Sequence, residues 1–263
     1  RVIERERELM SELRDREAQR TYEMQLAKEQ ADEANKSKSA FLAVVSHEIR
    51  TPMTGIMGMV RLLSESQMTK EQHDSVATIR SSCDAMMALL NDILDFEKIE
   101  RGKMDLEKIA FDMPQLIRGI VTLMSGHAME KKIEVRSKLS QGFPEKLYGD
   151  PARLRQVILN LVNNAIKFTE RGSVTIDVSA TPSENAGSHP HIQPYQVNFS
   201  ITDTGIGISK HAMASLFTPF SQAEKSTSRE YGGTGLGLTI CQKMIEAMGG
   251  SIRVERREGV GKR

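Results

Sequence analysis

One short segment brings together side chains that could carry nucleophilic chemistry. Residues 41–52 read F-L-A-V-V-S-H-E-I-R-T-P, with His47 beside Glu48 and Thr51 one helical turn further on. A neutral surface imidazole is a usable nucleophile near pH 7, and an adjacent carboxylate can hold one ring nitrogen as N–H while the other attacks. The alternative is an ordinary solvent-exposed histidine. Helical spacing predicts that His47 points outward from a buried face formed by Phe41, Val44, Val45 and Ile49.

A second polar stripe falls on a helix predicted over residues 150–168. Asn160, Asn164 and Lys167 stand at i, i+4 and i+7, and therefore on one helix face. An amide oxygen is a hard ligand that suits Mg²⁺, and a lysine ammonium suits phosphate oxygens. An ordinary hydrated helix face explains these three residues equally well.

Two glycine-containing segments complete the candidate chemistry. The segment D-T-G-I-G-I at 203–208 follows a predicted strand, and Gly205 and Gly207 would let its backbone approach a ligand closely. Asp203 could accept a hydrogen bond from an exocyclic amine such as that of adenine, although an ordinary glycine turn is the alternative. The segment G-G-T-G-L-G-L at 232–238 opens a predicted helix, where backbone N–H groups bind anions. Its spacing matches neither a dinucleotide fingerprint nor a Walker loop.

Composition restricts the class of protein that can hold these residues. The 263-residue chain has 36 basic and 35 acidic side chains, a balance that gives no support to a nucleic-acid partner. Two distant cysteines make a disulfide scaffold or a zinc site improbable and favour a reducing compartment. No apolar run is long enough to span a membrane, so no membrane contact and a cytoplasmic location are expected for this chain, whatever a longer protein would add.

The first hundred residues are predicted to be helical. Residues 1–35 have a long-helix composition with a weak heptad seam, which favours a two-stranded coiled coil over a single solvated helix. The helix bearing His47 should bend or loosen at Pro52. A second helix should begin at the capping box of Thr69 and Gln72 and continue to residue 97. Its heptad seam contains Val76, Ile79, Cys83, Met86, Leu90 and Ile93.

A helical hairpin cannot close a core alone, so a homodimer through residues 36–99 is expected, forming a four-helix bundle within a domain at 36–101. After a hinge near 100–103, residues 102–263 are predicted to form a mixed domain. The fold class is therefore multidomain, α followed by α+β. Strands are expected at 104–111, 132–139, 173–180, 195–203 and 251–257, and helices at 113–131, 150–168, 209–216 and 236–248. A surface loop is expected at 181–194 and a mobile segment at 223–234.

The five motifs H-E-I-R-T-P, N-L-V-N-N-A-I-K-F, D-T-G-I-G-I, L-F-T-P-F and G-G-T-G-L-G-L, in this order, resemble those of the sensor histidine kinases of two-component systems. Each motif is weak alone, but five in order make chance agreement improbable. The resemblance implies a dimeric four-helix bundle followed by an α/β sandwich that binds ATP, a fold shared with some chaperones, topoisomerases and mismatch-repair ATPases. The family also implies a closing hairpin and a final strand, and this chain stops before them.

The resemblance also implies a role for each matching residue. His47 would accept the phosphoryl group, Glu48 would orient or deprotonate it, and Thr51 would position a water that hydrolyses the partner's phospho-aspartate. Asn160 would bind Mg²⁺, while Asn164 and Lys167 would contact the ATP phosphates. The other expected nucleotide-site residues line the adenine pocket, form the root of a lid over 216–234 or cradle the phosphates: Phe168, Asp203, Gly205, Gly207, Phe217, Phe220, Gly233, Thr234, Gly235, Leu236 and Gly237.

The implied function is ATP-dependent autophosphorylation of His47 followed by transfer to an aspartate of a response-regulator receiver, with ATP and Mg²⁺ as cofactors. Three alternatives stay open. The first is a phosphatase-dominant protein acting through Thr51. The second is a non-catalytic dimeric switch that binds nucleotide or a partner kinase. The third is a chaperone-like ATPase, which would leave residues 36–99 without a purpose. The receiver would be supplied by another protein or, as in hybrid kinases, by the same one.

Overall fold

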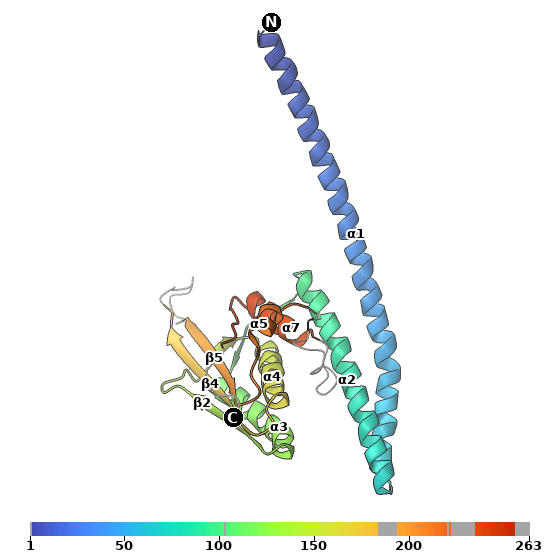
Figure 1. Ribbon diagram of the computed structural model, residues 1–263, viewed down its shortest axis with the longest axis vertical. Helices are drawn as coiled ribbons and strands as arrows, with labels where there is room; N and C mark the ends of the chain where they lie inside the picture. Colours follow the sequence, from blue (N-terminus) through green and yellow to red (C-terminus); the bar gives the residue numbers. More distant parts are fainter. Residues whose placement is uncertain (1, 103, 184–193, 220, 222–234, 256–263) are drawn as a thin grey trace. The chain divides into compact units, whose positions relative to one another are not determined.

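The computed structural model describes residues 2–102, 104–183, 194–219, 221 and 235–255 (Figure 1). It divides into two compact units, residues 1–97 and 98–263. Within the described residues, none of the helices is both long enough and apolar enough to cross a membrane.

The first unit is a helical hairpin made by α1 (Val2–Ser64) and α2 (Lys70–Glu100). The predicted capping box starts α2 and is confirmed. The Thr69 N–H donates to Gln72 Oε1 at 2.9 Å, and the Gln72 N–H donates to Thr69 Oγ1 at 3.3 Å. Helical structure in α1 continues through Pro52 to Ser64, so the proline does not end the helix.

The buried stripe of the hairpin differs from the predicted one. Phe41 and Val44 were expected on the buried face, but within one chain they are 66 % and 61 % exposed. Ile79 and Met86 of the predicted α2 seam are also exposed. The reason is geometric, because a single neighbouring helix covers only a narrow part of a wide apolar stripe. The residues that the hairpin does bury are Ser46, Met53, Val60, Val76, Cys83 and Leu90.

The second unit contains two small sheets. β1 (Ile109–Phe111) pairs antiparallel with β3 (Leu147–Gly149). The other sheet has the order β2 (Ile133–Leu139), β4 (Gly172–Pro182), β5 (Tyr195–Asp203). β2 runs parallel to β4, with Ile133 opposite Gly172, and β5 runs antiparallel to β4, with Asp203 opposite Val174. The parallel pair requires a crossover connection, which contains α4 (Pro151–Lys167).

Helices α3 (Met113–Glu130) and α4 cover one face of the three-stranded sheet (Figure 1). Each begins with an aspartate N-cap followed by a proline in the first turn, Asp112 for α3 and Asp150 for α4. The short α5 (Lys210–Ser215) has Ser209 as its N-cap, and α7 (Gly237–Ala247) packs on α4. The fully buried core lies between helices and sheet and includes Ile117, Ile120, Ile158, Val162, Val174 and Ile176.

Two predicted strands differ from the structure. The strand expected at 104–111 forms only over Ile109–Phe111. The strand expected at 251–257 is absent over the described part, residues 251–255. A strand needs a neighbouring backbone with which to form ladder hydrogen bonds, and the local sequence does not show whether one is present.

Candidate functional site

His47 lies on the surface of α1, as its position off the predicted apolar stripe indicated. Its side chain is 78 % exposed, and its Nδ1 is 3.7 Å from Glu48 Oε1, just beyond direct hydrogen-bond distance. The residue before it, Ser46, is only 2 % exposed. Successive helical residues are about 100° apart, so burying Ser46 against α2 turns His47 outward. The imidazole is therefore accessible to a reacting group.

Thr51 lies one turn after His47, and its hydroxyl is already engaged with the backbone. Thr51 Oγ1 donates to the carbonyl oxygen of His47 at 3.1 Å. A hydroxyl has one proton and two lone pairs, so an oxygen bonded in this way can still accept a hydrogen bond from water. This geometry fits a residue that orients a water beside the imidazole.

The polar stripe of α4 meets the start of α7, although the two segments are far apart in the sequence. Asn164 Nδ2 donates to Asn160 Oδ1 at 3.0 Å, and both side chains are half-buried. A Cβ added to Gly237 would lie 2.8 Å from Asn160 Nδ2 and 3.0 Å from Asn160 Oδ1. With glycine at position 237, the first turn of α7 comes this close to the asparagine pair without displacing the Asn160 amide.

The Asp203 turn packs against the end of α4. Asp203 Oδ1 accepts a hydrogen bond from the Gly205 N–H at 2.9 Å, and the Ile206 N–H donates to the Phe168 carbonyl oxygen at 3.1 Å. A Cβ on Gly205 would lie 2.3 Å from that same carbonyl oxygen. Gly207 has a φ of +71°, in the region that glycine adopts most readily. The turn is thus fixed by the carboxylate that was predicted to bind adenine.

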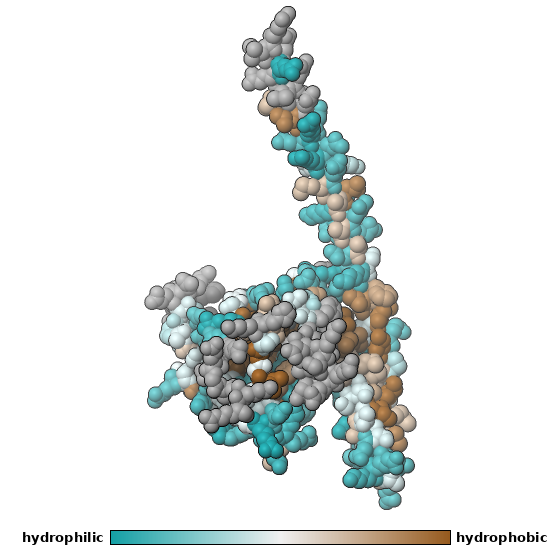
Figure 2. Space-filling model, in the orientation of Figure 1, coloured by the Kyte–Doolittle hydropathy of each residue, from teal (hydrophilic) through white to brown (hydrophobic). Residues whose placement is uncertain are grey.

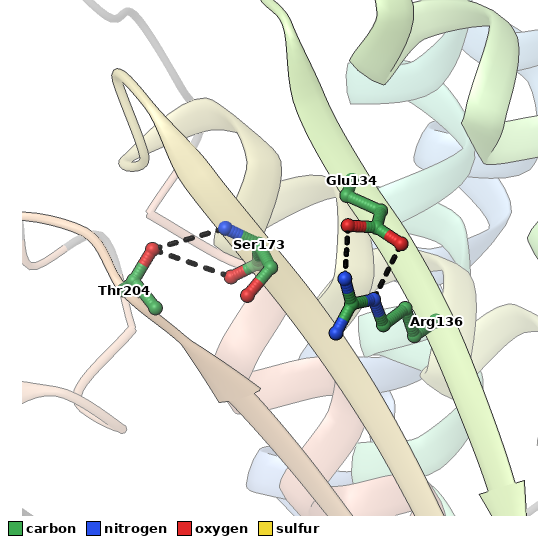
Figure 3. A network of polar contacts seen from close by, with 4 residues as sticks. All are labelled: Glu134, Arg136, Ser173 and Thr204. Atoms are coloured by element: carbon green, nitrogen blue, oxygen red, sulfur yellow. Dashed lines mark hydrogen bonds and ion pairs between the residues drawn. The ribbon is translucent and has the colours of Figure 1, made fainter.

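Thr204 holds the other side of this turn and was not singled out from the sequence. Its Oγ1 accepts a hydrogen bond from the Ser173 N–H at 3.1 Å and lies 3.5 Å from the Ser173 carbonyl oxygen (Figure 3). The Thr204 N–H also donates to the Ser173 carbonyl at 3.2 Å. An ideal Cβ on Gly172 would lie 2.1 Å from Thr204 Oγ1. A glycine that opens a strand is the sequence signal that could have indicated this close approach. Figure 3 also shows Glu134 paired with Arg136 on β2.

Lys167 is half-buried near the C-terminal end of α4. Its Nζ lies 5.2 Å from the centroid of the Phe168 ring. Burial lowers the pKa of Lys167, and the positive charge of Lys131 lowers it further. Lys131 was not singled out from the sequence, because the contact between positions 131 and 167 depends on how α3 and α4 pack.

The expected phosphate-binding segment is only partly described. Phe220, Gly233 and Thr234 lie outside the described residues. Gly235 has a φ of +70°, and Leu236 is 1 % exposed. Phe217, from the expected root of the lid, accepts a hydrogen bond at its carbonyl from Thr239 Oγ1 at 3.0 Å. α7 begins without a side-chain cap, and the N–H groups of an uncapped first turn, with the positive end of the helix dipole, form an anion-binding arrangement.

These residues fit a nucleotide better than an independent metal centre. Within the described ranges, no group of three or more His, Cys, Asp or Glu side chains could hold a metal ion. The half-buried carbonyl oxygen of Asn160 is a hard ligand, and a magnesium ion bound there would take its other ligands from phosphates and water. The glycine at the start of α7 lets the backbone of that helix's first turn lie close to this oxygen.

Both halves of the chain match known protein families. Residues 37–102 match the family described as "His Kinase A (phospho-acceptor) domain". Residues 149–263 match the family described as "Histidine kinase-, DNA gyrase B-, and HSP90-like ATPase". The exposed histidine lies in the first match, and the asparagine and glycine segments lie in the second.

Curated relatives and a solved structure agree with these matches. The chain is 45 % identical over 239 residues to the sensor histidine kinase GacS of Pseudomonas protegens, covering 91 % of this chain and 25 % of GacS. It is 43 % identical over 230 residues to the signal transduction histidine-protein kinase BarA of Escherichia coli, covering 88 % of this chain and 24 % of BarA. It is 38 % identical to ShkA, whose full-length crystal structure is a complex with AMPPNP, with a TM-score of 0.61 over 79 % of this chain and 41 % of ShkA.

A helical hairpin that exposes a histidine, followed by an α/β ATPase domain, defines the catalytic core of a protein-histidine kinase. The chain belongs to the sensor histidine kinases of two-component signal transduction. It spans about a quarter of the length of GacS and BarA.

Proposed function

We propose that this chain transfers the γ-phosphoryl group of ATP to His47 and then to an aspartate of a response-regulator receiver. The proposal rests on the close contact between Asn160 and Gly237, in a chain that also exposes His47. The first two residues place the N-terminal turn of α7 beside a hard oxygen ligand, an arrangement suited to bind phosphate and its metal ion, and the third is an accessible nucleophile. ShkA, which is similar over most of this chain, crystallised with AMPPNP, and that supports ATP as the nucleotide.

The chemical step follows from the placement of the side chains. Glu48 lies on the Nδ1 side of the imidazole, so the other nitrogen, Nε2, is the nucleophile. The Nε2–phosphorus bond forms as the bond from phosphorus to the bridging oxygen of ADP breaks, and Glu48 accepts the Nδ1 proton. Lys167 and the start of α7 neutralise phosphate charge, which is the main requirement of phosphoryl transfer. A magnesium ion held by Asn160 would neutralise further charge on the phosphates.

Dimerisation is supported by the apolar surface that the hairpin leaves exposed. Hydrophobic side chains gather along the hairpin, whereas the N-terminal part of α1 is largely hydrophilic (Figure 2). Such a continuous exposed stripe indicates an interface. The occupant that fits is a second hairpin, which would complete a four-helix bundle. The exposed stripe contains Phe41, Val44, Ile56, Met59, Leu62, Ile79, Met86 and Leu89. Met10, Leu13 and Met24 are exposed along the predicted heptad seam and would continue the dimer as a coiled coil.

The experiment is incubation of the chain with Mg²⁺ and ATP labelled on the γ-phosphate. Wild type should take up acid-labile label, and His47→Gln and Asn160→Ala should not, for different reasons. His47→Gln should still bind ATP because its nucleotide site is intact, whereas Asn160→Ala should bind ATP weakly. Acid-labile labelling of the His47→Gln protein would contradict the proposal.

A second activity, dephosphorylation of the receiver, is favoured by the geometry of Thr51. The hydroxyl is exposed beside His47 and retains an oxygen lone pair for water. Thr51→Ala should therefore take up label normally but remove phosphate from a phosphorylated receiver more slowly. Thr51→Ser, which keeps the hydroxyl, is the matched control and should preserve the second activity.

A further inference from the structure

Three consecutive carbonyl groups at the end of α4 each receive a hydrogen bond from outside the helix. Lys131 Nζ donates to the Ile166 carbonyl at 3.4 Å and to the Lys167 carbonyl at 3.2 Å. The Ile206 N–H donates to the Phe168 carbonyl at 3.1 Å. The last carbonyls of a helix lack intrahelical partners and carry the negative end of its dipole, so a lysine ammonium is a well-matched donor. The end of α4 is therefore held by Lys131 and by the Asp203 turn.

The fold places Lys131 at this point through the turn that follows α3. The Lys131 N–H closes α3 by donating to the Ala128 carbonyl at 3.1 Å. Lys132 then adopts a φ of 57°, and it is the only non-glycine residue with positive φ among those described. This left-handed residue reverses the chain so that β2 can start at Ile133, beside β4. The Lys131 side chain extends from this turn to the C-terminal end of α4.

The residues held in this way are those expected to contact the nucleotide. Lys167 and Phe168 follow the asparagine pair on α4, and Phe168 is also the residue against which Gly205 packs. Lys131 binds the backbone at position 167 and repels the ammonium of Lys167, since the two charges are alike. Both effects restrict where the Lys167 side chain can lie. Lys131 is thus linked to the nucleotide site without belonging to its expected contact residues.

We propose that Lys131 is a positioning residue of the nucleotide site, which fixes the last turn of α4 so that Lys167 and Phe168 are held ready for a nucleoside triphosphate. This inference rests on the proposed ATP site. It assigns to Lys131 an indirect role, because its ammonium binds protein carbonyls rather than phosphate oxygens.

The test measures ATP affinity with Mg²⁺ in four proteins, together with their melting temperatures. Lys131→Met removes both side-chain hydrogen bonds and should weaken ATP binding about tenfold, the expected scale for losing charge-assisted hydrogen bonds at a binding site. Lys131→Arg keeps a cationic donor and should restore most of the affinity. Lys132→Met is the matched control, because it removes the same charge one residue away and keeps a β-carbon at the strained position. Its affinity should equal that of wild type.

A double-mutant cycle separates positioning from general stability. In a Lys167→Met background, Lys131→Met should reduce ATP affinity much less than in wild type, because the side chain it orients is gone. Equal losses in both backgrounds would overturn the inference, as would unchanged affinity of Lys131→Met with only a lowered melting temperature. If Lys131→Met does not fold, the same comparison of ATP affinities is made with Lys131→Gln. Failure of wild type to bind ATP would instead refute the proposed function itself.

Discussion

The glycines of the proposed nucleotide site are fixed by contacts of the folded domain. A β-carbon on Gly205 would clash with the backbone carbonyl of Phe168, and one on Gly237 would displace the side-chain amide of Asn160. The Gly126 position in α3 has no heavy atom within 4 Å of an added Cβ. The glycines of this chain therefore differ in whether their surroundings exclude a β-carbon. Substitution by alanine should distinguish the two kinds.

Gly205→Ala should distort the turn between Asp203 and Phe168. The added methyl would lie 2.3 Å from the Phe168 carbonyl oxygen, which is backbone and cannot move aside cheaply. We expect a loss of about 1–3 kcal/mol in the free energy of unfolding, the usual scale for overpacking, together with weakened ATP binding. Denaturant unfolding and nucleotide titration measure the two effects, and unchanged values in both would contradict the assignment of this turn.

The lowered pKa of Lys167 predicts how ATP affinity depends on pH. Burial, with a further contribution from Lys131, lowers this pKa in the free domain. Phosphate oxygens stabilise the charged ammonium, so binding raises the pKa again and takes up a proton in the window between the two values. ATP affinity should therefore fall as the pH rises through the lowered pKa. Lys167→Arg stays charged and should show no such fall, whereas a flat wild-type profile up to the ordinary lysine value would contradict this account.

At the scale of elements, α4 connects the core to the site. Its apolar face packs on the sheet through Ile158 and Val162, while the opposite face carries the asparagine pair. This division was predictable from the sequence because helical periodicity places i and i+4 residues together. Asp150 as N-cap was predictable for the same kind of local reason. Contacts between elements, such as Lys131 with the end of α4 and Thr204 with Ser173, depend on packing and carry no local signal.

The hairpin shows the same limit. Helical spacing correctly indicated that His47 faces outward, but it could not divide a broad apolar stripe between the partner helix and the outer surface. The structure buries Ser46 and leaves Phe41 exposed within one chain. A polar residue on the buried line could not be recognised from hydrophobic periodicity, which assigns serine to the outside. The strand predicted from Ser251 does not form over the described residues 251–255, because pairing partners are not encoded locally.

Gly126→Ala should stabilise the second unit. Gly126 lies inside α3, where glycine costs about 1 kcal/mol relative to alanine, and the added methyl meets no neighbour. We expect the free energy of unfolding to rise by about 0.5–1 kcal/mol, with ATP affinity unchanged. Denaturant unfolding tests the change, and destabilisation would show that α3 packs differently from the structure.

At the scale of the whole molecule, the two units have different tasks. In the proposed function, the hairpin displays the histidine and provides the dimer surface, and the second unit binds the nucleotide. Transfer requires the second unit to bring its γ-phosphate to a His47, in the same chain or in the partner. In many enzymes, domain motions of this kind control the chemical step.

Met86→Glu should convert the proposed dimer to a monomer. Met86 is 51 % exposed within one chain and lies on the proposed interface, where a buried carboxylate would have no partner. Ser81→Glu places the same charge on another face of α2 and should leave the dimer intact. Sedimentation equilibrium gives the mass, and circular dichroism checks that the helices persist. A monomeric wild type, or a Met86→Glu protein that stays dimeric, would refute this interface.

The most direct measurement locates the phosphoryl group after incubation with Mg²⁺ and ATP. Fragmentation mass spectrometry at neutral pH should find one added phosphoryl group on the peptide containing residues 41–52, and assign it to His47. Ser46 and Thr51 provide internal controls, since both carry hydroxyls in the same peptide. Phosphate on either hydroxyl, or none in a chain that binds ATP, would contradict transfer from the nucleotide site to His47.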